Sequence, residues 1–287
     1  MTSGPLALLL PFVLLSFAAN SLITRHVVAE RLLDPGLLTC VRFLSGAVAL
    51  VALAVVRRER VETGRRNALP ALWLGLYAVC ISYGYLHIGA AAGTFVFYAS
   101  VLATLVLDDR LRGGVVPARR LAGAGVGLAG IGVLATESVE DVSLLGVALL
   151  VATGAAWGLY TAAGRGAGEP RRFTTGNFAV LALVLLLPTA GLAGSGVKIT
   201  SAGLFWGVVM GVGTTAFAYV AWYACQRLLT GSQAGLVQLV IPVLTTVGAV
   251  ALLDEPLTAR LAVAALLVGA GMWLGRAVPA RASAVAR

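Results

Sequence analysis

The chain has 287 residues, of which 59% are hydrophobic and 11% are charged, and its mean hydropathy is +0.94. Soluble domains carry about 25% charged residues, so this composition excludes an ordinary soluble protein. The net charge of +9 comes from basic residues in short clusters between apolar runs, which argues against a continuous nucleic-acid-binding patch. We therefore expect a polytopic membrane protein with no nucleic-acid partner.

Apolar runs separated by polar breaks predict ten transmembrane helices. A helix needs about 20 apolar residues to cross a bilayer. In chain order the approximate limits are 5–28, 36–56, 69–87, 89–108, 117–135, 143–163, 174–194, 202–224, 229–252 and 258–278. The third and fourth runs nearly touch, and so do the eighth and ninth. Nine spans are therefore the alternative, which would place the two termini on opposite sides.

The first run has a second interpretation as a secretory signal peptide, because residues 16–19 loosely resemble a cleavage site. Against this, no Lys or Arg precedes the run, and the run continues to Ile23. We therefore expect the first run to remain as a transmembrane helix.

The distribution of Lys and Arg predicts the orientation. With the N-terminus inside, 16 of the 21 basic residues fall on the cytoplasmic side. The five on the outer half are Arg25, Arg31, Arg42, Lys198 and Arg260. Because Lys and Arg concentrate in cytoplasmic loops, we expect a multi-pass protein of the cell (inner) membrane with both termini cytoplasmic.

Two weakly similar halves are predicted. Displacing the chain by 141 residues gives eight identities in the 34 positions from Val101 to Leu134, without a gap. We expect the first repeat at residues 1–138, the second at 139–279, and a cytoplasmic tail at 280–287. Because each half has an odd number of spans, the halves cross the membrane in opposite senses. The predicted fold is all-α, with ten transmembrane helices in two inverted five-helix repeats, an architecture that many secondary transporters use to alternate access.

Several short segments, in their order and spacing, are similar to the EamA-type branch of the drug/metabolite transporter superfamily. They are Cys40-Val-Arg-Phe43, Trp157-Gly-Leu-Tyr160, and Pro242 followed by Asp254-Glu255-Pro256-Leu257. The first half departs from the family pattern, because Val101 and Gly114 stand where Pro and Glu are usual. The resemblance implies transport of a small metabolite or drug, commonly export, without a nucleotide-hydrolysing subunit.

Polar and aromatic residues inside the predicted spans are candidates for a substrate cavity, because polar groups within a bilayer face the protein interior or water. The predicted substrate-binding residues are Asn20, Thr24, Tyr83, His87, Tyr98, Trp157, Tyr160, Tyr219 and Gln238. Aromatic rings with a few amides suit a small neutral or zwitterionic molecule, such as an amino acid or an aromatic compound. For the aromatic residues, an interfacial belt is the alternative.

Two residues are candidates for the moving parts of a transport cycle. Pro242 is predicted to be a hinge, because proline removes a backbone hydrogen bond and the hydroxyls of Thr245 and Thr246 could bond the freed carbonyls. His87 is either a proton-coupling or substrate-sensing group or a histidine hydrogen-bonded at the outer end of its span.

Three charged residues have two interpretations each. Arg42 lies about two turns inside its span, and we expect it to snorkel outward or to pair with Glu30 or Asp34, with anion binding as the alternative. Asp108 and Asp109 are either exposed ion-pairing residues at a helix end or deeper carboxylates that bind protons.

Glycines four residues apart form small-residue stripes, which predict close helix packing inside the bundle. The pairs are Gly123 and Gly127, Gly154 and Gly158, and Gly207 and Gly211.

We predict no catalytic residue, no metal site and no cofactor. The sequence lacks the H-E-x-x-H, G-x-S-x-G, C-x-x-C and G-x-x-x-x-G-K motifs, and its three cysteines are scattered. A transporter rather than an enzyme is therefore expected, with a polytopic membrane enzyme or a non-transporting scaffold as the alternatives. The expected partners are a small-molecule substrate and the lipid bilayer, with protons as a candidate coupling ion. A monomer is preferred over a dimer.

Overall fold

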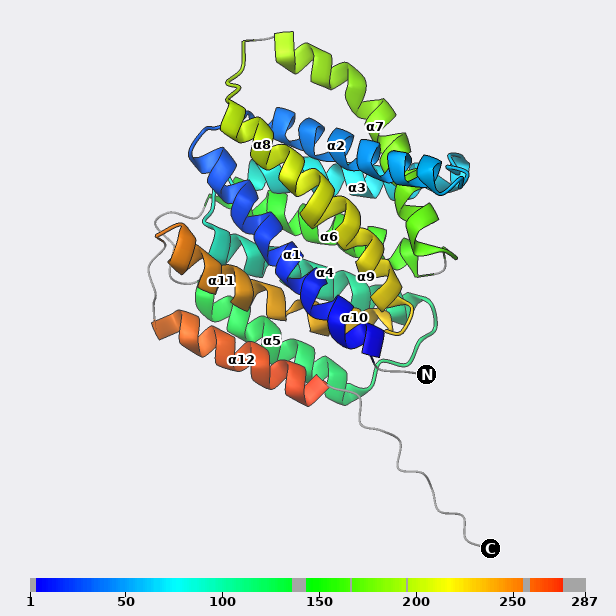
Figure 1. Ribbon diagram of the computed structural model, residues 1–287. Coiled ribbons are helices and arrows are strands. Elements are labelled where there is room, and N and C mark those ends of the chain that lie inside the picture. The colour runs from blue at the N-terminus through cyan, green and yellow to red at the C-terminus, as the bar shows by residue number, and fades with distance from the viewer. Residues whose placement is uncertain (1–3, 136–142, 166, 195, 255–258, 276–287) are drawn as a thin grey trace, which may run out of the picture.

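The computed structural model describes residues 4–135, 143–165, 167–194, 196–254 and 259–275 (Figure 1). Within these ranges the secondary structure is helical, and the only extended pairing is an isolated bridge between Leu33 and Ile199. The prediction of an all-α protein is therefore confirmed.

The first half of the chain forms α1 (Gly4–Ala29), α2 (Pro35–Val56), α3 (Arg65–Gly84), α4 (Ala90–Leu111) and α5 (Ala118–Ala135). The second half forms α6 (Leu144–Gly164), α7 (Pro170–Gly194), α8 (Ser201–Val209), the π-helix η2 (Met210–Phe217), α9 (Ala218–Gln226), α10 (Gly231–Gln238), α11 (Val240–Leu252) and α12 (Ala259–Gly275). Elements α8, η2 and α9 follow one another without a break.

Eight helical stretches of the described chain are long and apolar enough to cross a membrane. They lie in α1, α2, α3, α4, α6, α7, the continuous stretch Ser201–Gln226 and the stretch Gly231–Leu252. The chain is thus a multi-pass membrane protein. Helices α5 and α12 are not among these eight.

Local sequence signals explain where several helices begin. Asp34 caps α2 by accepting hydrogen bonds from the amides of Gly36 and Leu37, and Pro35 occupies the first turn. The start of α10 has a capping box formed by Thr230 and Gln233. Helix α7 begins at Pro170, four residues before its predicted limit. Proline favours the first turn of a helix, but the residues of this turn are polar, so hydropathy alone did not include them.

A π-helical segment, η2, interrupts the stretch Ser201–Gln226 and was not predicted. Such segments are frequent at functional sites, since the wider turn changes the direction of the following side chains. A second irregularity separates α10 from α11 at Leu239, three residues before Pro242. The helical hydrogen bond that Pro242 cannot donate would be accepted by the carbonyl of Gln238, the residue directly before this break. Thr246 donates to the carbonyl of Pro242 itself, at 2.8 Å, rather than to a carbonyl freed by the proline.

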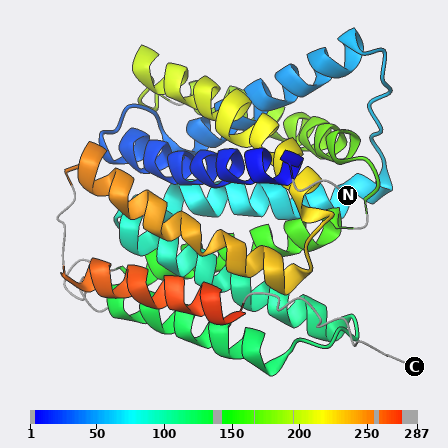
Figure 2. The ribbon, with the colours of Figure 1, turned by 60° about the horizontal axis from the view of Figure 1, so that its bottom comes forward.

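The packing of the helices is nearly layered (Figures 1 and 2). Helix α1 packs against α9 and α11, α6 packs against α3 and α4, and α2 packs against α7. Helices α5 and α12 lie side by side at one edge, where a side chain on Gly123 would meet the carbonyl oxygen of Gly271 at 2.5 Å. The glycine stripes face neighbouring helices, as predicted.

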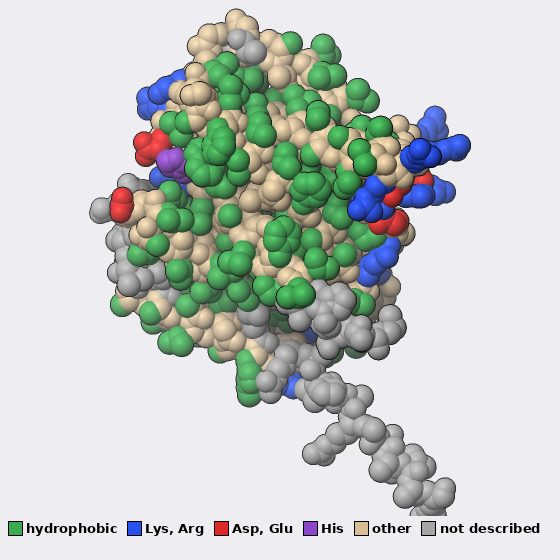
Figure 3. Space-filling view, viewed as in Figure 1, with side chains coloured by type: hydrophobic (Ala, Val, Ile, Leu, Met, Phe, Trp, Pro, Cys, Tyr) green, Lys and Arg blue, Asp and Glu red, His purple; other side chains and the backbone are tan. Residues whose placement is uncertain are grey.

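The surface between the two ends of the bundle is largely apolar, and charged side chains gather at the edges (Figure 3). Exposed residues of this apolar surface include Val48, Leu183, Val184, Leu187 and Val247. One end carries the basic connections 57–64, 112–117 and 227–230 together with Arg165, Arg171 and Arg172. We call it the arginine-rich end. An apolar belt between charged ends suits a protein embedded in a bilayer.

Candidate functional site

Arg42 of α2 lies at the centre of the bundle with no exposed surface. Its Nε donates to the Thr215 hydroxyl at 2.9 Å, and its Nη2 donates to the hydroxyls of Tyr77 and Tyr219 at 2.8 and 3.1 Å. It forms no ion pair with any described carboxylate. The prediction that Arg42 snorkels outward or pairs with Glu30 or Asp34 is therefore wrong, because the side chain turns inward to tyrosine and threonine hydroxyls.

Asn20 of α1 belongs to the same buried group. Its Nδ2 donates to the hydroxyls of Thr214 and Thr215 at 3.2 and 3.1 Å, while its Oδ1 is buried without a hydrogen-bond partner. Both threonines lie in η2. The π-helical segment thus places Thr215 where it contacts Arg42 and Asn20 at once.

Aromatic rings pack around this polar group. Trp157 is the common member, with ring centroids 5.3 Å from Phe17, 5.2 Å from Tyr77 and 4.7 Å from Tyr219. Trp157 is only 2% exposed, because α1, α3, α6 and α9 meet here. Edge-to-face and tilted contacts of this kind give a rigid, mostly apolar wall.

A small cavity of about 10 Å³ lies inside this wall. It is lined by Phe17, Asn20, Ser21, Tyr77, Phe97, Tyr98, Trp157 and Tyr219. A volume of this size holds a single water at most. The rings therefore pack across the space in which the sequence predicts a substrate, and a metabolite would enter only if they separate.

Gln238 joins this site to the break between α10 and α11. Its Oε1 accepts a hydrogen bond from Trp157 Nε1 at 2.8 Å, and its Nε2 donates to the carbonyl of Ala234 at 3.1 Å. Gln238 is the last residue of α10 and is fully buried. The interrupted helix thus ends at the residue that contacts the aromatic wall.

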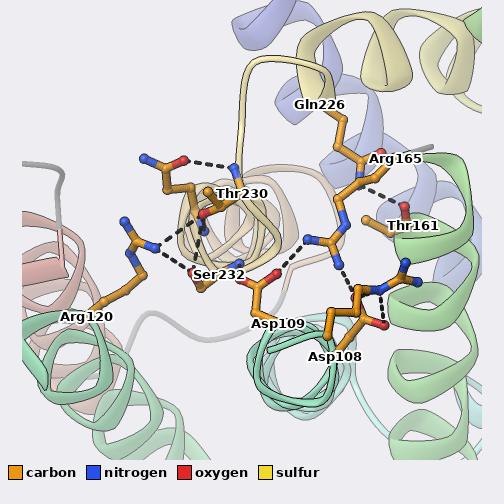
Figure 4. A network of polar contacts seen from close by, with 10 residues as sticks. Asp108, Asp109, Arg120, Thr161, Arg165, Gln226, Thr230 and Ser232 are labelled. Carbon is orange, nitrogen blue, oxygen red and sulfur yellow. Dashed lines mark hydrogen bonds and ion pairs between the residues drawn. The ribbon is translucent and has the colours of Figure 1, made fainter. Parts of the chain in front are cut away.

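A polar network, which we call the Asp109 network, joins α4, α6 and α10 at the arginine-rich end (Figure 4). Asp109 accepts from Arg165 at 2.6 Å and from the backbone amide of Ser232 at 2.7 Å. Asp108 pairs with Arg165 and, at 2.9 Å, with Arg112. Ion pairing at this helix end is therefore found, with Arg165 as the partner that the sequence did not suggest.

Two hydrogen bonds connect separate segments at the opposite end of the bundle. Arg25 of α1 donates to the carbonyl of Tyr85 at 2.7 Å, and Thr200 donates to the carbonyl of Leu32 at 2.6 Å. Polar contacts thus join separate helices at both ends of the bundle, with the small cavity between them.

Comparisons with known proteins identify the family. The EamA-like transporter family matches residues 144–275. A protein described as uncharacterised from Pseudomonas aeruginosa is 34% identical over 270 residues, 93% of each chain. This chain belongs to the EamA-like transporter family.

Two further similarities agree with this assignment. An uncharacterised transporter from Archaeoglobus fulgidus is 25% identical over 256 residues, which cover 85% of this chain and 89% of the relative. A solved crystal structure has the same fold, with a TM-score of 0.76 at 20% identity over 96% of this chain and 98% of its own. Members of the EamA-like family are transporters, so this protein is a membrane transporter.

The nine predicted site residues of this EamA-like transporter fall into three groups. Asn20, Tyr98, Trp157 and Tyr219 line the cavity. Gln238 bonds to Trp157, Tyr160 packs its ring 5.8 Å from Trp157, and Thr24 donates to the carbonyl of Asn20 at 2.7 Å. Tyr83 and His87 lie elsewhere: Tyr83 is 37% exposed, and His87 lies in the connection 85–89, beside Gly146.

Sequence reasoning missed several members of the site. They are Phe17, Ser21, Tyr77, Phe97, Thr214 and Thr215. Phe17 and Phe97 resemble ordinary core residues in an apolar run. The threonines depend on the π-helical segment, which also contains Gly211 and Gly213. Tyr77 could have been found, since it is the tyrosine nearest the middle of its span.

Proposed function

We propose that this EamA-like protein is a secondary transporter that exports a small neutral or zwitterionic metabolite, such as an amino acid or an aromatic compound. The observation that carries the proposal is the buried site in which both halves of the chain meet. Asn20, Arg42 and Tyr77 come from the first half, and Trp157, Thr215 and Tyr219 come from the second. A site between two halves is where alternating-access transporters bind their substrates.

The helix packing supports two inverted repeats as the moving units. Helix α4 begins at Ala90 and α10 at Gly231, while α5 begins at Ala118 and α12 at Ala259, so both pairs are 141 residues apart. Under this correspondence the contacts of α6 with α3 and α4 are equivalent to those of α1 with α9 and α11. A two-fold relation between five-helix halves explains both regularities.

The composition of the cavity wall supports the substrate class. Its rings offer apolar surface, and the unpartnered Asn20 Oδ1 offers an acceptor for a donor group such as an ammonium or an amide. We propose the monomer as the transport unit, since the helices of one chain surround the cavity. We also propose an inner-membrane location with both termini cytoplasmic and protons as the coupling ion.

Flux measurements in proteoliposomes test the proposed function. The purified chain is reconstituted, the vesicles are loaded with a mixture of amino acids and aromatic acids, and release is followed with and without a proton gradient. Protein-dependent release that the gradient accelerates supports the proposal. A product chemically distinct from the loaded compound would indicate an enzyme, and release equal to that of empty vesicles for every compound would favour a scaffold.

Pro242→Ala is expected to slow transport about tenfold while leaving the protein folded. Alanine restores a backbone donor beside the break at Leu239, and proline in a helix interior disfavours the helix by about 3 kcal/mol relative to alanine. The continuous helix would then resist bending. The measurement is initial flux together with the thermal unfolding midpoint. Pro188→Ala is the control, because Pro188 lies exposed within the continuous helix α7. An unchanged flux for Pro242→Ala would contradict the hinge.

A further inference from the structure

The guanidinium of Arg42 is a buried charge without a described counter-ion. Its side chain has no exposed surface, and the ion pairs of the described residues do not include it. Burial of a charge is strongly unfavourable unless the charge is paired and hydrogen-bonded. Hydroxyl dipoles from Tyr77, Thr215 and Tyr219 offset part of this cost, but none of them carries a negative charge.

The donors of Arg42 are only partly used. A guanidinium has five N–H groups, of which Nε carries one and each Nη carries two. Nε and Nη2 bond to three hydroxyls, while Nη1 is buried without a hydrogen-bond partner. Two N–H groups on one nitrogen therefore remain for another acceptor.

Arg42 lies directly behind the wall of the central cavity. Two of its three hydroxyl partners, Tyr77 and Tyr219, line the cavity, and its Cζ lies 5.3 Å from the centre of the Tyr77 ring. Asn20, which also lines the cavity, shares the Thr215 hydroxyl with Arg42. A ligand in an expanded cavity would thus need to displace only tyrosine hydroxyls to reach the guanidinium.

We infer that Arg42 binds a carboxylate group of the transported molecule. The inference rests on the proposed transport function and specifies its substrate class as molecules with one carboxylate, which are zwitterions such as amino acids or monoanions such as aromatic acids. Nη1 donates to the carboxylate oxygens, and the aromatic wall takes the rest of the molecule. A single negative charge matches the single guanidinium, whereas a phosphate dianion would leave one charge uncompensated in an otherwise apolar wall.

Ligand binding by matched acid–amide pairs tests this assignment. The probes are benzoate with benzamide, 3-phenylpropionate with 3-phenylpropanamide, and phenylalanine with phenylalaninamide. Dissociation constants are measured on the full-length protein in detergent from ligand-dependent shifts of the unfolding midpoint. At least one acid is expected to bind ten or more times more tightly than its amide. Equal affinity within every pair, or stabilisation by no acid, would overturn the inference.

Two substitutions separate ligand binding from a structural role of Arg42. Arg42→Gln is expected to abolish the preference for the acid, while Arg42→Lys retains a reduced preference because it keeps the charge. A purely structural arginine would lower the stability of both variants without changing the acid-to-amide ratio. If Arg42→Gln does not fold, Arg42→Lys with an unchanged ratio would overturn the inference and a reduced ratio would support it.

Flux distinguishes failure of this inference from failure of the proposed function. Acid-selective binding that depends on Arg42, without flux of any probe in proteoliposomes, would leave the carboxylate site standing and contradict the transport of these compounds. Flux of an acid and of its amide that Arg42→Gln leaves equally unchanged would instead support transport and overturn the carboxylate site.

Discussion

Replacement of Arg165 by methionine is expected to loosen the arginine-rich end of the bundle. Arg165 bonds Asp108 and Asp109, and the three side chains are only 13–17% exposed. Hydrogen bonds to charged groups contribute about 1.5–3 kcal/mol each, and partial exposure to solvent lowers this. We therefore expect the free energy that stabilises the packed arrangement of this end to fall by about 1–3 kcal/mol. The variant also leaves two adjacent carboxylates with fewer partners.

Hydrogen exchange at the start of α10 measures this effect directly. The amide of Ser232 donates to Asp109, so it reports whether the Asp109 network is formed. When exchange follows local opening, a decrease of 1.4 kcal/mol in the free energy of opening corresponds to about tenfold faster exchange of the Ser232 amide. Arg112→Met is the matched control, because Arg112 pairs with Asp108 from a side chain that is 63% exposed. Equal exchange in the two variants would show that the network does not hold this end closed.

Gly211→Ala is expected to reduce both stability and transport. A methyl group on Gly211 would overlap the backbone carbonyl oxygen of Arg42 and the hydroxyl of Ser45. The backbone oxygen cannot rotate away, so η2 and α2 must separate, at a cost of about 1–3 kcal/mol for overpacking. Separation also moves Arg42 away from Thr215. We expect an unfolding midpoint lowered by about 2–10 °C and transport reduced at least tenfold.

Gly213→Ala is the control for this substitution. Gly213 lies in the same π-helical segment, and a methyl group there would meet no atom of another helix within 4 Å. Its unfolding midpoint and transport should match those of the unchanged chain. A loss of similar size in both variants would show that glycine is needed for the segment itself, not for the contact between η2 and α2.

The helices could be predicted from hydropathy because burial in lipid requires long apolar runs. The predicted limits 36–56 and 117–135 differ by only one residue from α2 and α5. Larger differences arise where a helix begins with polar residues, as α3 does at Arg65 and α7 at Pro170. The first turn of each of these helices lies at the polar, arginine-rich end of the bundle and not in lipid, so hydropathy gives no signal for it.

Some residues of the site could be predicted from the sequence, but the contacts between them could not. Asn20 and Trp157 could be named because amides and indoles are uncommon in the middle of a span. The partners of Arg42 could not, since Thr215 and Tyr219 lie more than 170 residues away in sequence. Only the packing of α2 against η2 and α3 decides whether this arginine faces lipid, an acidic partner or a tyrosine hydroxyl.

The amino-acid sequence by itself determined that this is an all-helical membrane protein of the EamA-like family, because apolar runs and short motifs are local properties of the chain. The tertiary structure alone decided that Arg42 is buried without a described carboxylate, that the central cavity has a volume of only about 10 Å³, and that Asp109 joins α4 to α6 and α10. Hydrogen bonds and close packing act over a few ångströms between distant segments. Their pairing is therefore set only when the helices come together.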